Sequence, residues 1–256
     1  MKEERFFYDP ELSGELPADE AGHALRVLRL GTGDEIRLMD GRGTFCHATI
    51  TAATGHRCLY RIGKREPQEP AWQGHLHLAM APTKLMDRVE WFAEKATEIG
   101  FDELTFLNCR FSERRAVKEE RIEKILVSAM KQSRKAWKPV LNGMTPFERF
   151  VREEREGGKF ICHCHGNEEL SVRNGELQAD ESSAAGIKPL LMDVLIRGVP
   201  ATVLIGPEGD FSIDEVRLAM RHGFQCVSLG RSRLRTETAA LVAVHMMQLK
   251  NTLYNI

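Results

Sequence analysis

TVLIGPEGDFS, residues 202–212, is an apolar stretch of strand type that runs directly into a loop with two glycines and a proline. Glycine allows the backbone of such a loop to approach a ligand closely. Ser212 and Glu215 have the spacing of a capping box, which predicts that a helix begins where the loop ends. A strand, a glycine-containing loop and a helix in this order are typical of a parallel α/β sheet, in which the loops after the strands bind ligands.

A second loop, LGRSRLRTETA at residues 229–239, also follows a strand pattern and precedes an apolar helix pattern. It contains three arginines, Arg231, Arg233 and Arg235, within five residues. Either loop alone is most simply a tight turn or a solvated surface. Because the two loops follow consecutive strands, we interpret them together as a binding site.

The rest of the chain from residue 73 alternates between strand and helix patterns. Strand patterns are found at residues 75–80, 104–107, 160–164, 202–205 and 226–229, and helix patterns at residues 85–99, 122–129, 189–197, 212–222 and 236–249. This alternation predicts an α/β domain with a mostly parallel sheet and helices on both faces.

The N-terminal quarter of the chain has a different pattern. Short β patterns occur at residues 5–8, 34–39, 44–50 and 58–62, with glycine turns between them and one helix pattern at residues 23–29. These features predict a small β-barrel with one helix. Two prolines within residues 66–70 predict a linker. We therefore expect two domains, residues 1–68 and residues 73–256.

Several common kinds of site are excluded by the sequence. The chain has no dinucleotide-binding, P-loop, nucleophile-elbow or zinc-protease motif in the required context. Cys162, His163 and Cys164 lie in a strand pattern without a second close Cys/His pair, so we interpret them as strand residues with buried thiols and expect no metal.

The six cysteines are widely spaced and no apolar stretch is long enough to span a bilayer. We expect a soluble, cytoplasmic protein with reduced thiols and no membrane partner.

The net charge of −1 gives no sign of a nucleic-acid partner for the chain as a whole. Residues 110–138, however, contain ten Lys and Arg against four Glu. One interpretation is a solvated helix face with i,i+4 ion pairs. We prefer phosphate contacts, with stacking on Trp137, because residues 131–138 contain no acid. The residues expected to bind RNA are Arg114, Lys131, Arg134, Lys135 and Lys138, together with Arg5, Arg26 and Arg29 in the N-terminal domain.

The two loops resemble the cofactor motifs of the 16S ribosomal RNA uracil-N3 methyltransferases, a family of the trefoil-knot SPOUT class. The resemblance covers the whole chain. It extends to Arg5-Phe6-Phe7, His23, residues 26–29 and Gly33-Asp34, which match a PUA-like β-barrel, and to Lys84, residues 94–100 and residues 132–134 in the second domain. It implies a deep C-terminal trefoil knot, a homodimer, S-adenosylmethionine as cofactor, and 16S rRNA or the assembled small ribosomal subunit as substrate.

The resemblance also implies which residues surround the cofactor. They are Leu204, Ile205, Gly206, Pro207, Glu208, Gly209, Leu229, Gly230, Leu234, Arg235, Thr236, Thr238 and Ala239. One position departs from the family pattern, because Asp210 stands where the family has a second glycine. Aspartate tolerates the left-handed backbone conformation better than most residues, so the loop can still form.

Methylation at N3 of uracil requires removal of the proton that this nitrogen carries, and stabilisation of negative charge on O2 and O4. Arg235, with Arg233 and Arg231, offers permanent positive charge for this purpose. Glu208 and Glu237 are the titratable groups within the two motifs and the candidates for the base. Helix capping or ribose binding is the alternative role for each of them. Arg235, Glu237 and Glu208 are thus the candidate catalytic residues.

Two other functions share part of these features. A knotted methyltransferase of ribose 2′-O usually has an asparagine-containing stretch where this chain has Arg235-Thr236-Glu237-Thr238, which argues against that reaction. A non-catalytic RNA-binding or ribosome-assembly factor would keep the barrel without needing the cofactor loops. Because both loops are present, the sequence favours an enzyme.

Overall fold

The computed structural model describes residues 5–166, 172–173, 176–177 and 188–252. The chain divides into two compact units. The first comprises Met1–Ala71 and Lys124–Lys138, and the second comprises Trp72–Glu123 and Pro139–Ile256. The predicted linker at residues 66–70 lies just before the change of unit. That residues 124–138 group with the N-terminal residues was not predicted.

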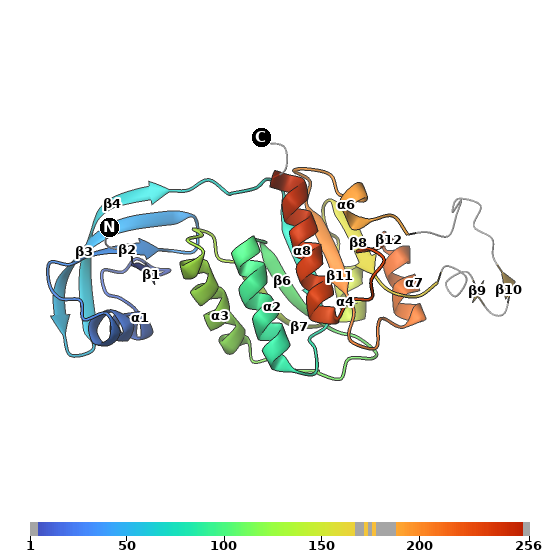
Figure 1. Cartoon of the computed structure of the whole chain (residues 1–256), viewed down its shortest axis with the longest axis horizontal. Coiled ribbons are helices and arrows are strands. Elements are labelled where there is room, and N and C mark those ends of the chain that lie inside the picture. The colour runs from blue at the N-terminus through green and yellow to red at the C-terminus, as the bar shows by residue number, and fades with distance from the viewer. Residues whose placement is uncertain (1–4, 167–171, 174–175, 178–187, 253–256) are drawn as a thin grey trace. The chain divides into compact units, whose positions relative to one another are not determined.

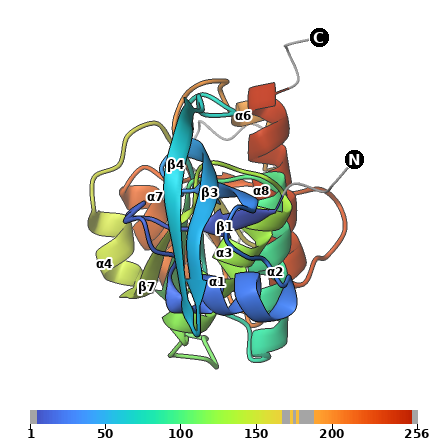
Figure 2. The same ribbon diagram turned by 90° about the vertical axis from the view of Figure 1, so that its left-hand side faces the viewer.

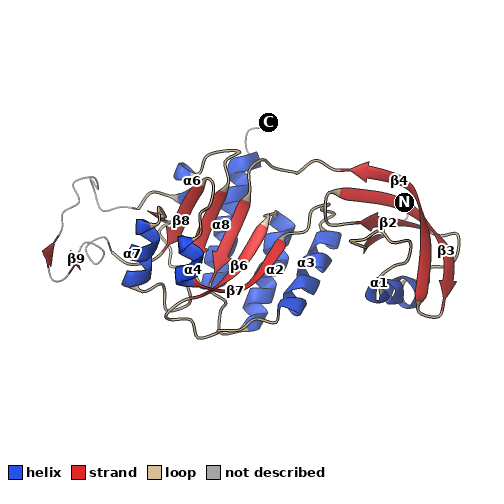
Figure 3. Ribbon diagram, turned by 180° about the vertical axis from the view of Figure 1, so that it is seen from behind, coloured by secondary structure: helices blue, strands red, loops and turns tan. Residues whose placement is uncertain are grey.

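The first unit is built on a four-stranded sheet in the order β1-β2-β3-β4. Its elements are β1 (Phe6–Tyr8), α1 (Ala18–Gly22), a π-helical turn (His23–Val27), β2 (Glu35–Met39), β3 (Thr44–Thr54) and β4 (Arg57–Pro67). Strand β1 pairs with β2 in parallel, and the other neighbours are antiparallel. Phe7, Leu38 and Ile50 are fully or almost fully buried in its core. Figure 3 shows β3 and β4 as the long strands of this sheet.

Strand β4 is longer than its sequence pattern suggested, and it includes the first part of the predicted linker. Glu66 pairs with Phe45 and Pro67 with Thr44, and the Glu66 carboxylate lies 3.0 Å from the Arg37 guanidinium. Pro67 is tolerated because it is the last residue of an edge strand, where its missing N–H costs no ladder bond. The prediction of a linker that begins at residue 66 was therefore wrong by two residues.

The second unit is an α/β domain with a six-stranded sheet in the order β12-β8-β11-β5-β6-β7, and every neighbouring pair is parallel. Its elements are β5 (Leu76–Met80), α2 (Met86–Ile99), β6 (Glu103–Asn108), α3 (Glu119–Gln132, which continues into the first unit), β7 (Val140–Pro146), α4 (Phe147–Arg152), β8 (Gly158–Cys162), β9 (Val172–Arg173), β10 (Glu176–Leu177), α6 (Leu191–Val194), β11 (Ala201–Ile205), α7 (Ile213–Arg221), β12 (Gln225–Val227) and α8 (Thr236–Thr252). The predicted α/β architecture is confirmed (Figure 1).

Helices cover both faces of this sheet. Helices α2 and α8 pack against each other on one face, and α4 and α7 pack together on the other (Figure 2). All five residues of β5 and of β11 are buried, as expected for central strands covered on both faces. Of the described helices, none is long and apolar enough to cross a membrane.

Four elements of the second unit were missed by the sequence patterns: β7, α4 and the two-residue strands β9 and β10. Strand β7 contains Asn142, Gly143 and Pro146, which are rare in strands, and its exposed pattern reflects its position at the edge of the sheet. Helix α4 has only six residues, although it buries Phe147, Phe150 and Val151. Short elements of this kind carry too few periods for a hydrophobic pattern to be recognised.

Candidate functional site

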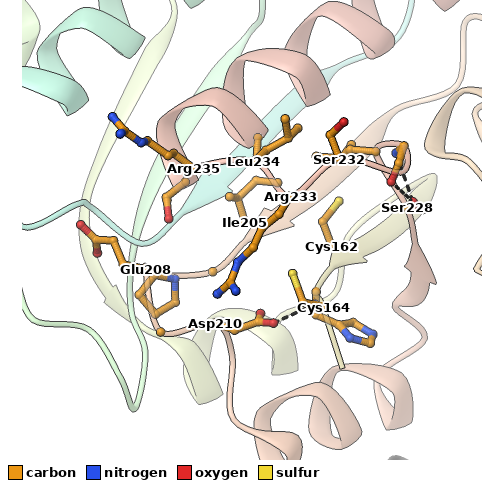
Figure 4. A pocket seen from close by; sticks show the side chains of 18 of the residues that line it. Cys162, Cys164, Ile205, Glu208, Asp210, Ser228, Ser232, Arg233, Leu234 and Arg235 are labelled. Atoms are coloured by element: carbon orange, nitrogen blue, oxygen red, sulfur yellow. Dashed lines mark hydrogen bonds between the residues drawn. The ribbon is translucent and has the colours of Figure 1, made fainter. Parts of the chain in front are cut away.

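A pocket of about 610 Å³ lies at the carboxyl ends of β8, β11 and β12. Because these strands are parallel neighbours, with Ile205 in register with Cys162 and Cys162 with Val227, the loops that follow them open on the same side of the sheet. The pocket is lined by Arg88, Cys162, His163, Cys164, Ile205, Gly206, Pro207, Glu208, Gly209, Asp210, Val227, Ser228, Leu229, Gly230, Ser232, Arg233, Leu234, Arg235, Thr236 and Ala239. Figure 4 shows Arg235 and Glu208 at one end of it and Ser228 and Ser232 at the other.

The pocket brings together all of the residues expected around a cofactor except two. Leu204 is fully buried in the core on the α7 face of the sheet, and Thr238 lies in the first turn of α8 without lining the pocket. In a strand, alternate side chains point to opposite faces, so Leu204 turns away where Ile205 faces the ligand space.

The loop after β11 is held in shape by its own side chains. Ser212 accepts a hydrogen bond from the Glu215 backbone N–H, and the Glu215 carboxylate accepts one from the Ser212 backbone N–H, so the predicted capping box is present. A Cβ atom at Gly206 would lie 3.1 Å from the backbone nitrogen of Phe211, whose side chain is fully buried. A larger residue at position 206 would therefore push into the core or into the pocket.

Asp210 adopts the left-handed conformation, with φ of 65°. Its side chain lines the pocket, and its Oδ2 accepts a hydrogen bond of 2.7 Å from the backbone N–H of Cys164. The departure from the family glycine thus preserves the loop conformation and adds a bond between the loops that follow β8 and β11.

Glu208 is exposed at the rim of the pocket, and one of its carboxylate oxygens accepts a hydrogen bond of 2.8 Å from the backbone N–H of Lys84. Arg114 holds the same segment, because its guanidinium donates to the carbonyl oxygens of Thr83 and Lys84. Arg114, which the charge pattern assigned to RNA, is therefore engaged in positioning residues 83–84 beside Glu208.

The loop after β12 is fixed by a hydroxyl and a glycine. Ser228 Oγ accepts a hydrogen bond from the Gly230 backbone N–H and donates one to the Gly230 carbonyl oxygen. Gly230 has φ of 127°, a conformation that side chains disfavour. Beyond it, Arg233 and Arg235 are exposed and line the pocket, whereas Arg231 is exposed and lies outside the lining.

Glu237 lies outside the pocket lining, beside Arg88. Its side chain is buried in the first turn of α8, and its Oε1 lies 3.7 Å from Arg88 Nε. Arg88 itself lines the pocket. Of the two carboxylates proposed as the base, Glu208 lines the pocket and Glu237 does not.

The largest omission of the sequence analysis concerns the end of β8. The strand ends at Cys162, so the prediction of a strand through residue 164 with buried thiols was wrong. Cys164 is exposed, and Cys162, His163 and Cys164 all line the pocket. Burial lowers the pKa of His163 to about 3.

In the part of the chain that the structure describes, no group of three or more His, Cys, Asp or Glu side chains could hold a metal ion.

Several of the basic residues assigned to RNA have partners within the first unit. The Lys131 ammonium lies beside the Glu20 carboxylate, and the Arg134 guanidinium lies over the Phe6 ring. Lys135 is partly buried, which lowers its pKa, and a Cβ atom at Gly43 would clash with the Trp137 ring. Lys138 is partly exposed, and its backbone N–H donates to the Gly41 carbonyl oxygen. Part of this basic segment therefore stabilises the first unit.

In the N-terminal residues, Arg5, Arg26 and Arg29 are all exposed. Arg5 donates a long hydrogen bond of 3.5 Å to the Leu28 carbonyl oxygen. Arg29 has φ of 54°, in the left-handed region. Of the expected set, these three side chains and that of Arg134 are exposed.

A parallel α/β domain with its pocket at the carboxyl ends of three adjacent strands belongs to the large class of enzymes that bind a ligand at that edge. The family model for the RNA methyltransferase domain matches residues 70–248 of this chain. The family model for the RNA methyltransferase PUA domain matches residues 16–62. The chain therefore belongs to the RNA methyltransferase family, and the resemblance noted in its two loops is confirmed.

Its relatives agree with this assignment. The chain is 28% identical to the ribosomal RNA small subunit methyltransferase E of Rickettsia conorii, over 97% of this chain and 96% of that protein. It is 40% identical to the solved structure of a probable rRNA-methyltransferase from Porphyromonas gingivalis, covering 98% of this chain and 100% of the other, with a TM-score of 0.86. The ribosomal RNA small subunit methyltransferase E from Neisseria gonorrhoeae, solved bound to S-adenosyl methionine, is 26% identical over 96% of this chain and 97% of its own, with a TM-score of 0.75.

Proposed function

We propose that this chain is an S-adenosylmethionine-dependent methyltransferase that methylates N3 of one uridine in 16S rRNA of the small ribosomal subunit. The observation that carries the proposal is the pocket itself, which is built from the two loops whose sequences resemble the cofactor motifs of that family. The cofactor assignment is supported by the Neisseria gonorrhoeae relative, which was solved with S-adenosyl methionine bound.

The pocket suits a nucleoside-containing cofactor. Its volume falls within the range of roughly 300 to 1,000 Å³ that is usual for small-molecule sites. Ile205, Val227, Leu229 and Leu234 provide apolar surface for a purine ring, while the backbone of residues 206–209 and 228–230 offers polar groups around it. When bound, S-adenosylmethionine supplies an electrophilic methyl group.

The protein side of the reaction is to orient the uracil and to move one proton. Glu208 is a candidate for accepting the N3 proton, because its carboxylate lies at the rim and one oxygen is held by Lys84. Arg235 lines the same end of the pocket (Figure 4), and it is our candidate for stabilising the negative charge that spreads to O2 and O4. Glu237 would act by orienting Arg88.

The proposal includes the features that the family resemblance implies but that the fold alone does not test. They are a trefoil knot formed by the C-terminal strands and helices, a homodimer, and a division of labour in which residues 1–68 bind RNA and residues 73–256 carry the reaction. A ribosomal substrate would place the reaction in the cytoplasm.

The direct test is to map methyluridine in 16S rRNA by mass spectrometry after incubation with the protein and S-adenosylmethionine. Naked 16S rRNA and assembled small subunits, both prepared from cells that lack the modification, would be compared as substrates. A single 3-methyluridine is the expected product. A methyl group on a ribose 2′-oxygen, or no methyl transfer to either substrate, would contradict the proposal.

RNA binding by the first unit leads to a separate prediction. The double variant Arg26→Gln, Arg29→Gln should bind 16S rRNA more weakly, and the slope of log K against log salt should become shallower by about 1 to 1.5, because each phosphate contact contributes about 0.7 for single strands. The measurement is filter binding over a range of salt concentrations.

The matched control is Arg57→Gln in the same unit. Arg57 is exposed, but its guanidinium is already paired with the Glu15 carboxylate at 2.7 Å. Its loss should leave the salt slope unchanged. Equal slopes for the wild type and the double variant would remove Arg26 and Arg29 from the RNA-binding surface.

A further inference from the structure

His163 is the first residue beyond β8, and it lies between the loops that follow β11 and β12. Its side chain is buried, with 8% of the residue exposed, and it lines the pocket. Its position in the sequence pattern indicates no role for it, and neither the family resemblance nor the names of the relatives assign it one.

One nitrogen of the His163 ring is occupied by Lys188. The Lys188 ammonium has three hydrogens and three acceptors around it: His163 Nδ1 at 3.0 Å, the His163 carbonyl oxygen at 2.6 Å and the His165 carbonyl oxygen at 2.8 Å. A lysine ammonium only donates hydrogen bonds, so Nδ1 must accept. In a neutral imidazole the proton is then on Nε2.

The other nitrogen, Nε2, is buried and has no hydrogen-bond partner among the residues that the structure describes. A buried donor without an acceptor costs free energy, and such groups are rare in folded proteins unless something else satisfies them. Because the residue lines the pocket, the natural acceptor is an atom of the ligand that the pocket binds.

We propose that His163 binds the cofactor directly, by donating a hydrogen bond from Nε2 to an acceptor atom of S-adenosylmethionine. This inference rests on the proposed function. The acceptor is a nitrogen or oxygen of the adenosine part or the carboxylate of the amino-acid part, since all of these accept a hydrogen bond from a neutral imidazole.

The surroundings keep His163 in the form that this bond requires. Burial is the main cause, and the neighbouring Lys188 charge the second, of a pKa near 3. The ring therefore stays neutral at physiological pH, and Lys188 holds its proton on Nε2. His163 offers a fixed donor to the ligand and does not exchange protons during the reaction.

The test uses two substitutions that separate the two nitrogens. His163→Asn places an amide oxygen near the position of Nδ1, where it can still accept from Lys188, but it removes the Nε2 donor. His163→Gln places an amide N–H near the position of Nε2 and so retains that donor. We expect the Asn variant to lose affinity for S-adenosylhomocysteine by about ten-fold in isothermal titration calorimetry, and the Gln variant to recover most of it.

A second ligand locates the acceptor. 5′-Methylthioadenosine has the adenosine part but lacks the amino-acid carboxylate. If the Asn variant loses affinity for both ligands equally, the acceptor is in the adenosine part; if only S-adenosylhomocysteine is affected, it is the carboxylate. Either result supports the proposal.

A substitution far from the pocket serves as the control for these affinities. His56→Asn changes an exposed turn residue outside the pocket lining and should leave both affinities unchanged. Thermal unfolding without ligand would report whether the His163 variants are folded. Wild-type affinity in a folded Asn variant would overturn the role of His163, as would equal losses in the Asn and Gln variants. Failure of the wild-type protein to bind either ligand would instead contradict the proposed function.

Discussion

Replacing Arg235 by alanine should lower kcat for methyl transfer by at least about 100-fold, the effect typical of removing a group that stabilises charge in the transition state. The Kd for S-adenosylmethionine should change by no more than about three-fold, because the lost interaction develops only as the uracil becomes negatively charged. The measurements are single-turnover transfer to 16S rRNA and calorimetric titration with the cofactor.

The structural basis is a guanidinium without a partner among the described residues, at the end of the pocket where Glu208 also lies. The Arg235 side chain is exposed and forms no hydrogen bond or ion pair with the described residues, although it lines the pocket. Its backbone is fixed, because its carbonyl oxygen accepts the first helical hydrogen bond of α8 from Ala239 at 2.8 Å. A guanidinium cannot lose its charge in a protein, so it can stabilise an anion without a change of protonation.

Arg231→Ala is the matched control for this experiment. Arg231 belongs to the same loop and carries the same charge, but it does not line the pocket. Its replacement should reduce kcat by less than about three-fold, which separates a specific contact from the general loss of one positive charge. If the Arg231 and Arg235 variants lose activity equally, charge density in the loop is what matters and Arg235 has no special contact.

The sequence predicted which two loops line the pocket, because the signals that mark these loops are local. The loop after β11 is recognisable in the sequence by two glycines and a capping box within about ten residues. Both features are present in the structure. The loop after β12 is marked by Gly230 and three arginines in the same way. Local chemistry of this kind requires no knowledge of which strands become neighbours.

The parts that were missed depend on contacts between distant residues. The location of His163 in the pocket follows from the order β12-β8-β11, which brings residues 162–164 beside residues 205–210. The pairing of Lys131 with Glu20 joins residues 111 positions apart, and it gives a side chain expected to bind phosphate an acidic partner within the first unit. An alternating pattern or a count of charges contains no information about such partners.

The choice between the two candidate bases also depends on such contacts. Glu237 is buried beside Arg88, and its Oε2 has no hydrogen-bond partner among the described residues. A proton acceptor must come within hydrogen-bond reach of the N3 proton, directly or through one water. Glu208 satisfies this condition better, because it lies in the pocket lining and only one of its oxygens is held, by the Lys84 backbone N–H.

Glu208→Gln should therefore lower kcat by about 100-fold or more, the usual contribution of a positioned base. The glutamine oxygen can still accept the hydrogen bond from Lys84, so the rim should keep its shape and cofactor affinity should be nearly retained. The rate of the variant should rise with pH, because hydroxide increasingly replaces the lost base. Glu237→Gln is the matched comparison: for a residue that only orients Arg88, kcat should fall by less than about ten-fold, since an amide of the same size still presents an oxygen beside the guanidinium. A larger loss in the Glu237 variant than in the Glu208 variant would reverse the assignment, and it would mean that Arg88 moves aside when the uridine binds.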